Sequence, residues 1–174
     1  MKKKKIFLGI GIVLLAILTY FQVISNNVIT LNNEVFINAS PDKVWSILNN
    51  LEEVENYNPQ VSKAVCISTE HSGVNASRQC TMKDGSVIKE RVSLVEPYQA
   101  ITMELYESSW PVQNMKWRTA ITAKNSGTLV TQKLQYQVKY GAFGALLNSV
   151  MMKNKMYKSL EEVFTELKNY SETK

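Results

Sequence analysis

The feature that most constrains the fold is a helical stretch, residues 39–59, which lies between one short strand and all the others. It reads ASPDKVWSILNNLEEVENYNP. Ser40 is a good N-cap, and Pro41 occupies the first helical position, where its missing N–H costs nothing. Two asparagines interrupt this helix, residues 51–57 predict a second one, and Pro59 ends it. The fold must therefore place two short helices beside its first strand.

The rest of the chain predicts an antiparallel sheet followed by one long helix. Residues 34–38 form the first predicted strand, and residues 61–138 alternate strand-like segments with short turns. Short connections favour antiparallel neighbours, so we expect six further strands in a meander. Residues 143–170 then predict a long amphipathic helix. Its main apolar stripe is Leu146, Val150, Tyr157, Leu160, Phe164 and Leu167, widened by Phe143, Leu147, Met151 and Val163.

The turns also predict how neighbouring strands pair. A two-residue turn at Asp84-Gly85 would place Glu90 opposite Gln79. A turn at Pro97-Tyr98 would place Val92 opposite Met103 and Leu94 opposite Ile101. Because side chains alternate between the two faces of a strand, these registers gather the apolar residues on one face.

This arrangement resembles the helix-grip fold of the START-like, SRPBCC superfamily, and in particular its polyketide cyclase/dehydrase-like branch. The resemblance rests on NASPDKVWSILNNLEEVENYNP at 38–59, on MKDGSVIKERV at 82–92 and on the closing helix, and it covers nearly all of 33–170. The segment 57–59 reads Tyr-Asn-Pro where the family usually has Trp-x-Pro. The resemblance implies an α+β fold with a curved seven-stranded antiparallel sheet. The two short helices would plug one end of the sheet, and the long helix would cross the concave face above a hydrophobic cavity.

Residues on the inward face are the candidates for lining that cavity. Glu90 is the most interesting of them, because a carboxylate in a cavity could anchor a polar group of a ligand. A core glutamate bonded to Gln79 or Tyr136 is the alternative. Five methionines could add a soft, adaptable lining, although methionine at helical spacing is also ordinary core: residues 103, 115, 151, 152 and 156. The predicted ligand-binding residues are Glu90, Gln79, Tyr136, Trp117, Met103, Met115, Leu105, Val92 and Met151.

The N-terminus predicts a membrane segment. Four lysines, residues 2–5, precede 19 uncharged residues, Ile6–Ile24, which as a helix would span roughly 28 Å. Positive charge stays on the cytoplasmic side, so the remaining chain is expected outside the membrane. A cleavable signal peptide is the competing interpretation, and it would make the domain secreted. We therefore expect a signal anchor at 1–26, a linker at 27–33 and a helix-grip domain at 34–170.

Charge and motifs argue against several functional classes. The formal net charge of +5 falls to +1 without the four N-terminal lysines, which does not support nucleic-acid binding. The single histidine, His71, lies in a predicted turn, and the two cysteines form no CxxC motif. No metal site or cofactor is therefore expected, and neither is a Ser-His-Asp or Cys-His arrangement. The expected state is a monomer.

The two cysteines predict a disulfide. A hairpin centred on Gly73 would place Cys66 directly opposite Cys80 on the solvent face, close enough to bridge. Export would supply an oxidising compartment. Two unpaired thiols in a shifted register are the alternative.

Together these features predict a membrane-tethered, extracytoplasmic domain that binds a hydrophobic small molecule or lipid in an internal cavity. The alternative function is an enzyme of the polyketide cyclase/dehydrase or hydrolase kind. In that case Glu90 would act as acid or base, and Tyr136 or Gln79 would orient the substrate.

Overall fold

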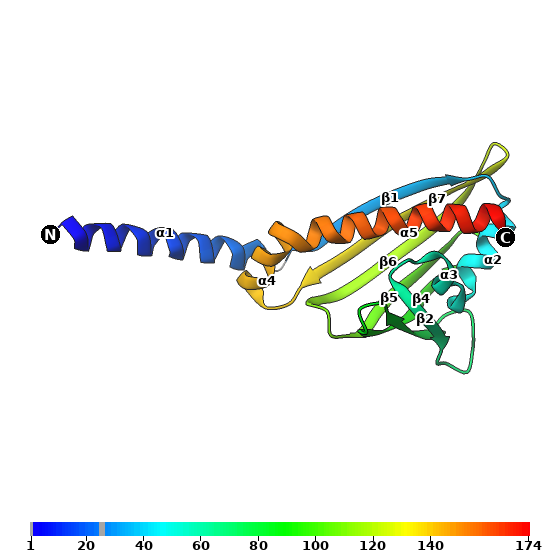
Figure 1. Ribbon diagram of the computed structural model, residues 1–174, viewed down its shortest axis with the longest axis horizontal. Coiled ribbons are helices and arrows are strands. Elements are labelled where there is room, and N and C mark those ends of the chain that lie inside the picture. Colours follow the sequence, from blue (N-terminus) through cyan, green and yellow to red (C-terminus); the bar gives the residue numbers. More distant parts are fainter. Residues whose placement is uncertain (1, 25–26) are drawn as a thin grey trace.

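A curved antiparallel sheet wraps around one long helix, and a further helix, α1, projects from one end (Figure 1). The computed structural model describes residues 2–24 and 27–174, with the side chains of 10–23 and 27–174. The seven strands lie in the order β1-β7-β6-β5-β4-β3-β2. The elements are α1 Lys2–Ile24, β1 Ile29–Ile37, α2 Pro41–Asn49, the 3₁₀ helix Leu51–Glu53, α3 Val54–Tyr57, β2 Val61–Cys66, β3 Ser77–Met82, β4 Val87–Glu96, β5 Ala100–Ser108, β6 Val112–Lys124, β7 Gly127–Val138, α4 Gly141–Leu147, the π-helix Asn148–Met152 and α5 Lys153–Thr173.

The two short helices close one end of the sheet, as predicted. Ser40 caps α2 by accepting a hydrogen bond from the backbone N–H of Lys43, and Pro41 is its first residue. The buried face of α2 joins one apolar cluster with Tyr57 of α3 and with Phe164 and Leu167 of α5. This cluster fixes the C-terminal half of α5 against the sheet.

The first strand is longer than predicted. β1 begins at Ile29 rather than at Glu34, so most of the predicted linker belongs to the sheet. It pairs with β7 along its whole length, from Ile29 opposite Tyr136 to Ile37 opposite Thr128. The pairing partner lies about a hundred residues away, so local sequence gave little sign of it.

The predicted register between β3 and β4 is wrong by one residue. The backbone N–H of Met82 donates to the carbonyl oxygen of Ser86, so three residues, 83–85, separate the last paired residues. Gly85 has φ +83°, and the side chain of Asp84 accepts hydrogen bonds from Ser86. Glu90 therefore lies opposite Arg78 rather than Gln79. A one-residue change reverses the faces of a strand, so Arg78, Cys80 and Met82 are buried in place of Gln79 and Thr81.

The predicted register between β4 and β5 is correct at its centre. Val92 lies opposite Met103, as expected. A bulge at Ser93 then shifts the pairing, so Ile101 faces Val95 and Leu94 is exposed. A bulge changes the face toward which the following side chains of its strand point, and the sequence around Ser93 gives no clear sign of a bulge.

The predicted disulfide is wrong. Cys66 lies opposite Arg78, and Cys80 lies opposite Ala64, so the register is shifted by two residues. Both thiols are free, and Cys80 is buried on the inner face of the sheet. The loop is longer than the predicted turn because the hydroxyl of Ser68 accepts from the backbone N–H of Ser77 and donates to the carbonyl of Glu70.

The C-terminal helical segment is not one regular helix. The π-helix Asn148–Met152 separates α4 from α5, and its wider turn rotates the helix face. Phe164 and Leu167 are buried as predicted, whereas Leu146, Val150 and Tyr157 of the same predicted stripe are exposed. Met151 is exposed as well, which contradicts its predicted place in a cavity lining.

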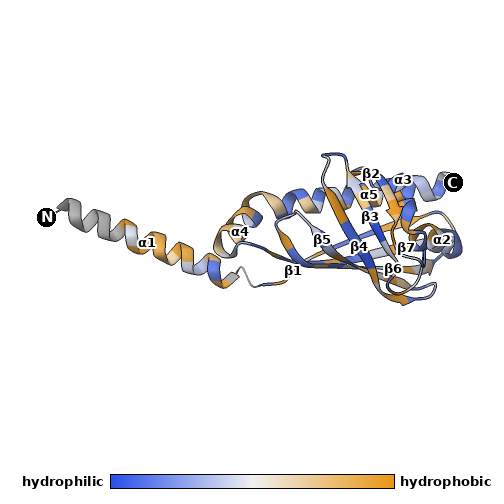
Figure 2. Ribbon diagram, turned by 90° about the horizontal axis from the view of Figure 1, so that it is seen from below, coloured by the Kyte–Doolittle hydropathy of each residue, from blue (hydrophilic) through white to orange (hydrophobic). Residues whose placement is uncertain are grey.

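The N-terminal segment forms the single helix α1 (Figure 2). Counting only the residues whose side chains the structure describes, which in α1 are 10–23, no helix is both long enough and apolar enough to cross a membrane. Ser25 and Asn26, at the predicted end of the anchor, lie outside the described residues.

Candidate ligand-binding site

The middle of the concave face carries apolar side chains that are only partly buried. Leu105 of β5 and Trp117 of β6 point inward between apolar clusters, and Met152 and Met156 approach from the helical side. Trp110, just before β6, packs against the same region. Side chains that face a core are normally buried completely, so their partial exposure marks the least tightly packed part of the inner face. We call Leu105, Trp110, Trp117, Met152 and Met156 the concave apolar surface.

The structure brings together most of the predicted lining residues. Val92, Met103, Met115 and Tyr136 are buried on the concave side, and Leu105 and Trp117 lie among them partly exposed. Gln79 and Met151 point elsewhere, because the β3–β4 loop is longer and the π-helix rotates the helix face. Met152 and Met156, suggested by the sequence as part of a methionine lining, do lie on this surface, and their spacing of four residues continues that of Leu160 and Phe164.

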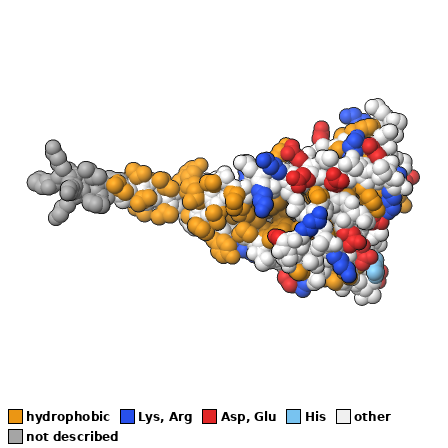
Figure 3. Space-filling view, in the orientation of Figure 1, with side chains coloured by type: hydrophobic (Ala, Val, Ile, Leu, Met, Phe, Trp, Pro, Cys, Tyr) orange, Lys and Arg blue, Asp and Glu red, His pale blue; other side chains and the backbone are white. Residues whose placement is uncertain are grey.

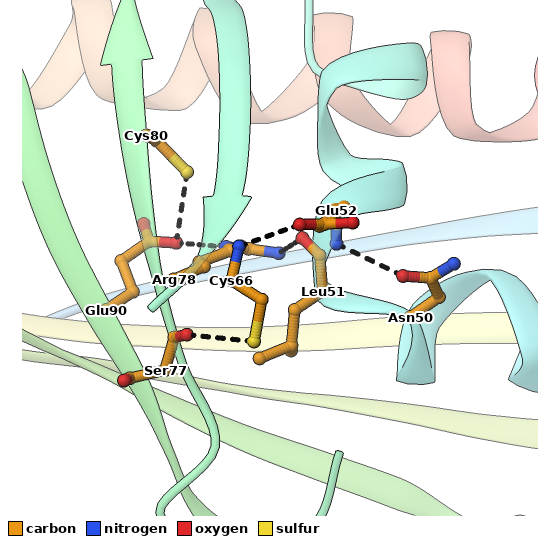
Figure 4. Close-up of polar contacts among 8 residues, drawn as sticks. All are labelled: Asn50, Leu51, Glu52, Cys66, Ser77, Arg78, Cys80 and Glu90. Atoms are coloured by element: carbon orange, nitrogen blue, oxygen red, sulfur yellow. Dashed lines mark hydrogen bonds and ion pairs between the residues drawn. The ribbon is translucent and has the colours of Figure 1, made fainter. Parts of the chain in front are cut away.

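Glu90 does not face an open cavity. Its Oε2 lies 2.6 Å from Nε of Arg78, and Nη1 of Arg78 donates to the carbonyl oxygen of Leu51 at 2.9 Å (Figure 4). Only 7% of Glu90 and 6% of Arg78 are exposed. The pair therefore links the sheet to the 3₁₀ helix beneath α3. A carboxylate held in this way is a structural group, and the arrangement gives no support to Glu90 as a catalytic acid or base.

Two further groups complete this buried polar cluster. Sγ of Cys80 lies 3.8 Å from Oε2 of Glu90, and Tyr57 is buried close by. Burial, and then the charge of Glu90, raise the pKa of the Cys80 thiol to about 12. Burial also raises the pKa of Tyr57. Burial acts to lower the pKa of Arg78, but the neighbouring Glu90 carboxylate outweighs it and holds that pKa above its ordinary value. At neutral pH the guanidinium keeps its charge and the thiol keeps its proton.

Tyr136 ties the sheet to the π-helix at the opposite end. Its hydroxyl donates a 2.8 Å hydrogen bond to Oδ1 of Asn148, and both side chains are buried. Burial raises the pKa of this phenol to about 12. Asn148 is the first residue of the π-helix, so the bond holds the helical segment where its face changes.

Two open depressions lie away from the concave apolar surface. One, of about 520 Å³, is formed by β1, β6 and β7 with Tyr157. The other, of about 790 Å³, lies beside α2 and contains Trp45 and Tyr98, whose rings are 5.7 Å apart. None of the nine predicted ligand-binding residues lines either depression. Within the described part of the chain, no group of three or more His, Cys, Asp or Glu residues could hold a metal ion.

Several solved structures share this architecture. A protein from Thermus thermophilus is 17% identical with a TM-score of 0.69, over 82% of this chain and 97% of that chain. A START superfamily protein from Mycobacterium smegmatis is 18% identical with a TM-score of 0.68, over 82% and 97%. Ginseng major latex-like protein 151 from Panax ginseng is 15% identical with a TM-score of 0.68, over 83% and 97%. At these identities the likeness concerns the fold alone.

The sequence itself identifies the family. A search of curated proteins finds no match to this chain. The family described as "Polyketide cyclase / dehydrase and lipid transport" matches residues 28–172, which include every strand and, apart from α1 and the last residue of α5, every helix. That range spans the sheet, the two short helices and the closing helix. The chain therefore belongs to the polyketide cyclase/dehydrase and lipid transport family.

Proposed function

We propose that the domain binds a hydrophobic small molecule or lipid between α5 and the concave face of the sheet. The observation that carries this proposal is the partial exposure of the concave apolar surface, in a family whose description includes lipid transport. Its sulfur and indole side chains would suit an apolar chain, since methionine adapts its shape to irregular partners. The ligand would displace water from this surface and gain the hydrophobic free energy of burial.

We further propose that α1 holds the domain at a membrane, with the domain on the extracytoplasmic side. Lys2 to Lys5 and the apolar residues that follow support this orientation. Apolar side chains of α1 from Ile10 to Val23 are mostly exposed, so they are available to lipid. A tethered domain of this kind would take its ligand from the membrane that holds it.

Native mass spectrometry of the full-length chain tests the binding proposal. The chain is extracted in mild detergent and measured with its co-purifying lipids, then stripped and offered a panel of fatty acids, phospholipids and aromatic compounds. Two neighbouring methionines supply a matched pair of variants. Met152→Trp would fill the space beside the concave apolar surface, whereas Met151→Trp places the same ring on the exposed side.

We expect one bound apolar molecule per chain in the wild type and in Met151→Trp, and loss of that molecule in Met152→Trp. A wild-type chain that stays empty across the whole panel would contradict the proposed function. Equal binding by the two variants would place the ligand elsewhere.

A further inference from the structure

The helical segment next to α1 presents an apolar face to the outside. The exposed fractions are 62% for Phe143, 41% for Leu146, 71% for Val150 and 57% for Met151. These four side chains lie on α4 and the π-helix, and all of them are exposed. We call them the outer apolar face. Four large apolar side chains gathered on one short segment are more than the scattered apolar residues of an ordinary surface.

The structure holds this face outward at two points. The hydrogen bond from Tyr136 to Asn148 fixes the start of the π-helix. Gly144 packs so closely on the carbonyl oxygen of Lys139 that no side chain would fit there. With both points fixed, Gly144, Ala145 and Asn148 take the buried side of the segment, and the four apolar side chains lie on its exposed side.

The outer apolar face continues the apolar surface of α1. Phe21 packs against the same cluster as Ala145 of α4, and Gln22 lies beside Gly141. Figure 3 shows hydrophobic side chains running from α1 onto the adjoining end of the domain. If α1 lies in a membrane, the outer apolar face lies at the level where that helix leaves it.

The charged residues of this segment also favour a position at the surface of a membrane. From Gly141 to Leu160 the chain contains three lysines, Lys153, Lys155 and Lys158, and no acidic residue. All three lysines are exposed. An apolar face bordered by lysines is typical of helices that lie in the headgroup region of a bilayer, and it favours anionic lipids.

We propose that the outer apolar face docks into the headgroup region of a bilayer that contains anionic lipid. The proposal rests on the membrane tether proposed above, and it adds a second contact that orients the domain. Met151 would face the bilayer while the adjacent Met152 faces the concave apolar surface. The ligand would then be a lipid of that bilayer, and it would enter beside the π-helix without crossing water.

Photo-crosslinking in the full-length chain tests this docking. A benzophenone amino acid replaces Val150 in one variant and Leu94 in the control. Leu94 is also exposed and apolar, but it lies on β4, next to Val95, which packs in the cluster beneath α2. Each variant is reconstituted into vesicles of phosphatidylethanolamine with phosphatidylglycerol and recovered by flotation. After irradiation, lipid adducts are counted by mass spectrometry.

We expect the yield of lipid adducts at position 150 to exceed that at position 94 by about tenfold or more. Adducts between two copies of the chain at position 150 would show that the outer apolar face is a protein interface, and would overturn the docking. A chain that floats with the vesicles but gives equal yields at both positions would overturn it too, while leaving the tether intact. A chain that does not float would overturn the tether and the docking together. Ligand binding in detergent is measured separately, so its failure can be told apart from all of these outcomes.

Discussion

Removing the charge of Glu90 should destabilise the domain strongly. Glu90→Gln keeps the shape of the side chain and an oxygen that can accept from Nε of Arg78, but it leaves the buried guanidinium without a counter-charge. Breaking a buried ion pair by neutralising one partner costs about 3–5 kcal/mol. Because glutamine retains one hydrogen bond, we expect about 3 kcal/mol, a large fraction of the 5–15 kcal/mol that stabilises a typical domain.

Urea unfolding of the full-length chain in detergent, followed by tryptophan fluorescence, measures this change. The matched control is Glu107→Gln, because Glu107 pairs with Lys89 at the surface and its side chain is 62% exposed. An exposed pair of this kind contributes at most about 1 kcal/mol. The double variant Arg78→Met/Glu90→Leu removes both buried charges, and we expect it to recover most of the stability lost in Glu90→Gln.

One result would refute the reasoning. If Glu90→Gln and Glu107→Gln both unfold within about 1 kcal/mol of the wild type, Glu90 is not the buried partner of Arg78. The role of its carboxylate as a catalytic acid or base would then have to be reconsidered.

Three further predictions concern packing, thiols and pH. Gly144→Ala should lower the free energy of unfolding in urea by about 1–3 kcal/mol, because the added methyl group would overlap a backbone carbonyl just before α4. Gly11→Ala, whose methyl group meets open space, should leave domain stability unchanged, and equal effects would contradict the close packing. A short pulse of iodoacetamide on the native chain, without reductant, should label Cys66 and spare Cys80, whose thiol is buried and has a raised pKa. In urea both thiols should be labelled, and an absence of labelling there would reveal a disulfide. Burial raises the pKa of Tyr136 from 10.0 to about 12, so between these pH values the folded chain keeps a proton that the unfolded chain loses. The free energy of unfolding should therefore fall as pH rises through that window, and it should fall less steeply in Tyr136→Phe. Identical slopes for the two proteins would contradict the raised pKa.

Local signals in the sequence predicted the fold well where the structure is itself local. Ser40 and Pro41 fixed the start of α2, and alternation along β4 placed Glu90 and Val92 on the inner face. The prediction failed where one residue more or less in a loop turns the side chains of a strand toward the other face of the sheet. Three residues rather than two separate the last paired residues of β3 and β4, and this alone exchanged Gln79 for Arg78 as the partner of Glu90.

The side of the C-terminal helical segment that packs on the sheet differs from the predicted one because of a tertiary contact, which local sequence does not reveal. The π-helix begins at Asn148, whose partner Tyr136 lies on β7. A regular helical period predicted Val150 and Met151 inside, whereas the rotated face brings Met152 and Met156 inward. The concave apolar surface therefore depends on a tertiary hydrogen bond as well as on apolar pattern.

Quenching of Trp117 tests most directly whether an apolar ligand occupies the concave apolar surface. A fatty acid brominated in mid-chain quenches an indole that it contacts, and it is titrated into the full-length chain in detergent, with the unbrominated acid as reference. We expect quenching that saturates at one ligand per chain and that is lost in the double variant Trp110→Phe/Trp117→Phe, because both indoles belong to the concave apolar surface. It should persist in Trp45→Phe, because Trp45 is a buried residue of α2 at the end of the sheet. Saturable quenching that survives in the double variant Trp110→Phe/Trp117→Phe, or no saturable quenching in the wild type, would contradict a ligand site between α5 and the sheet.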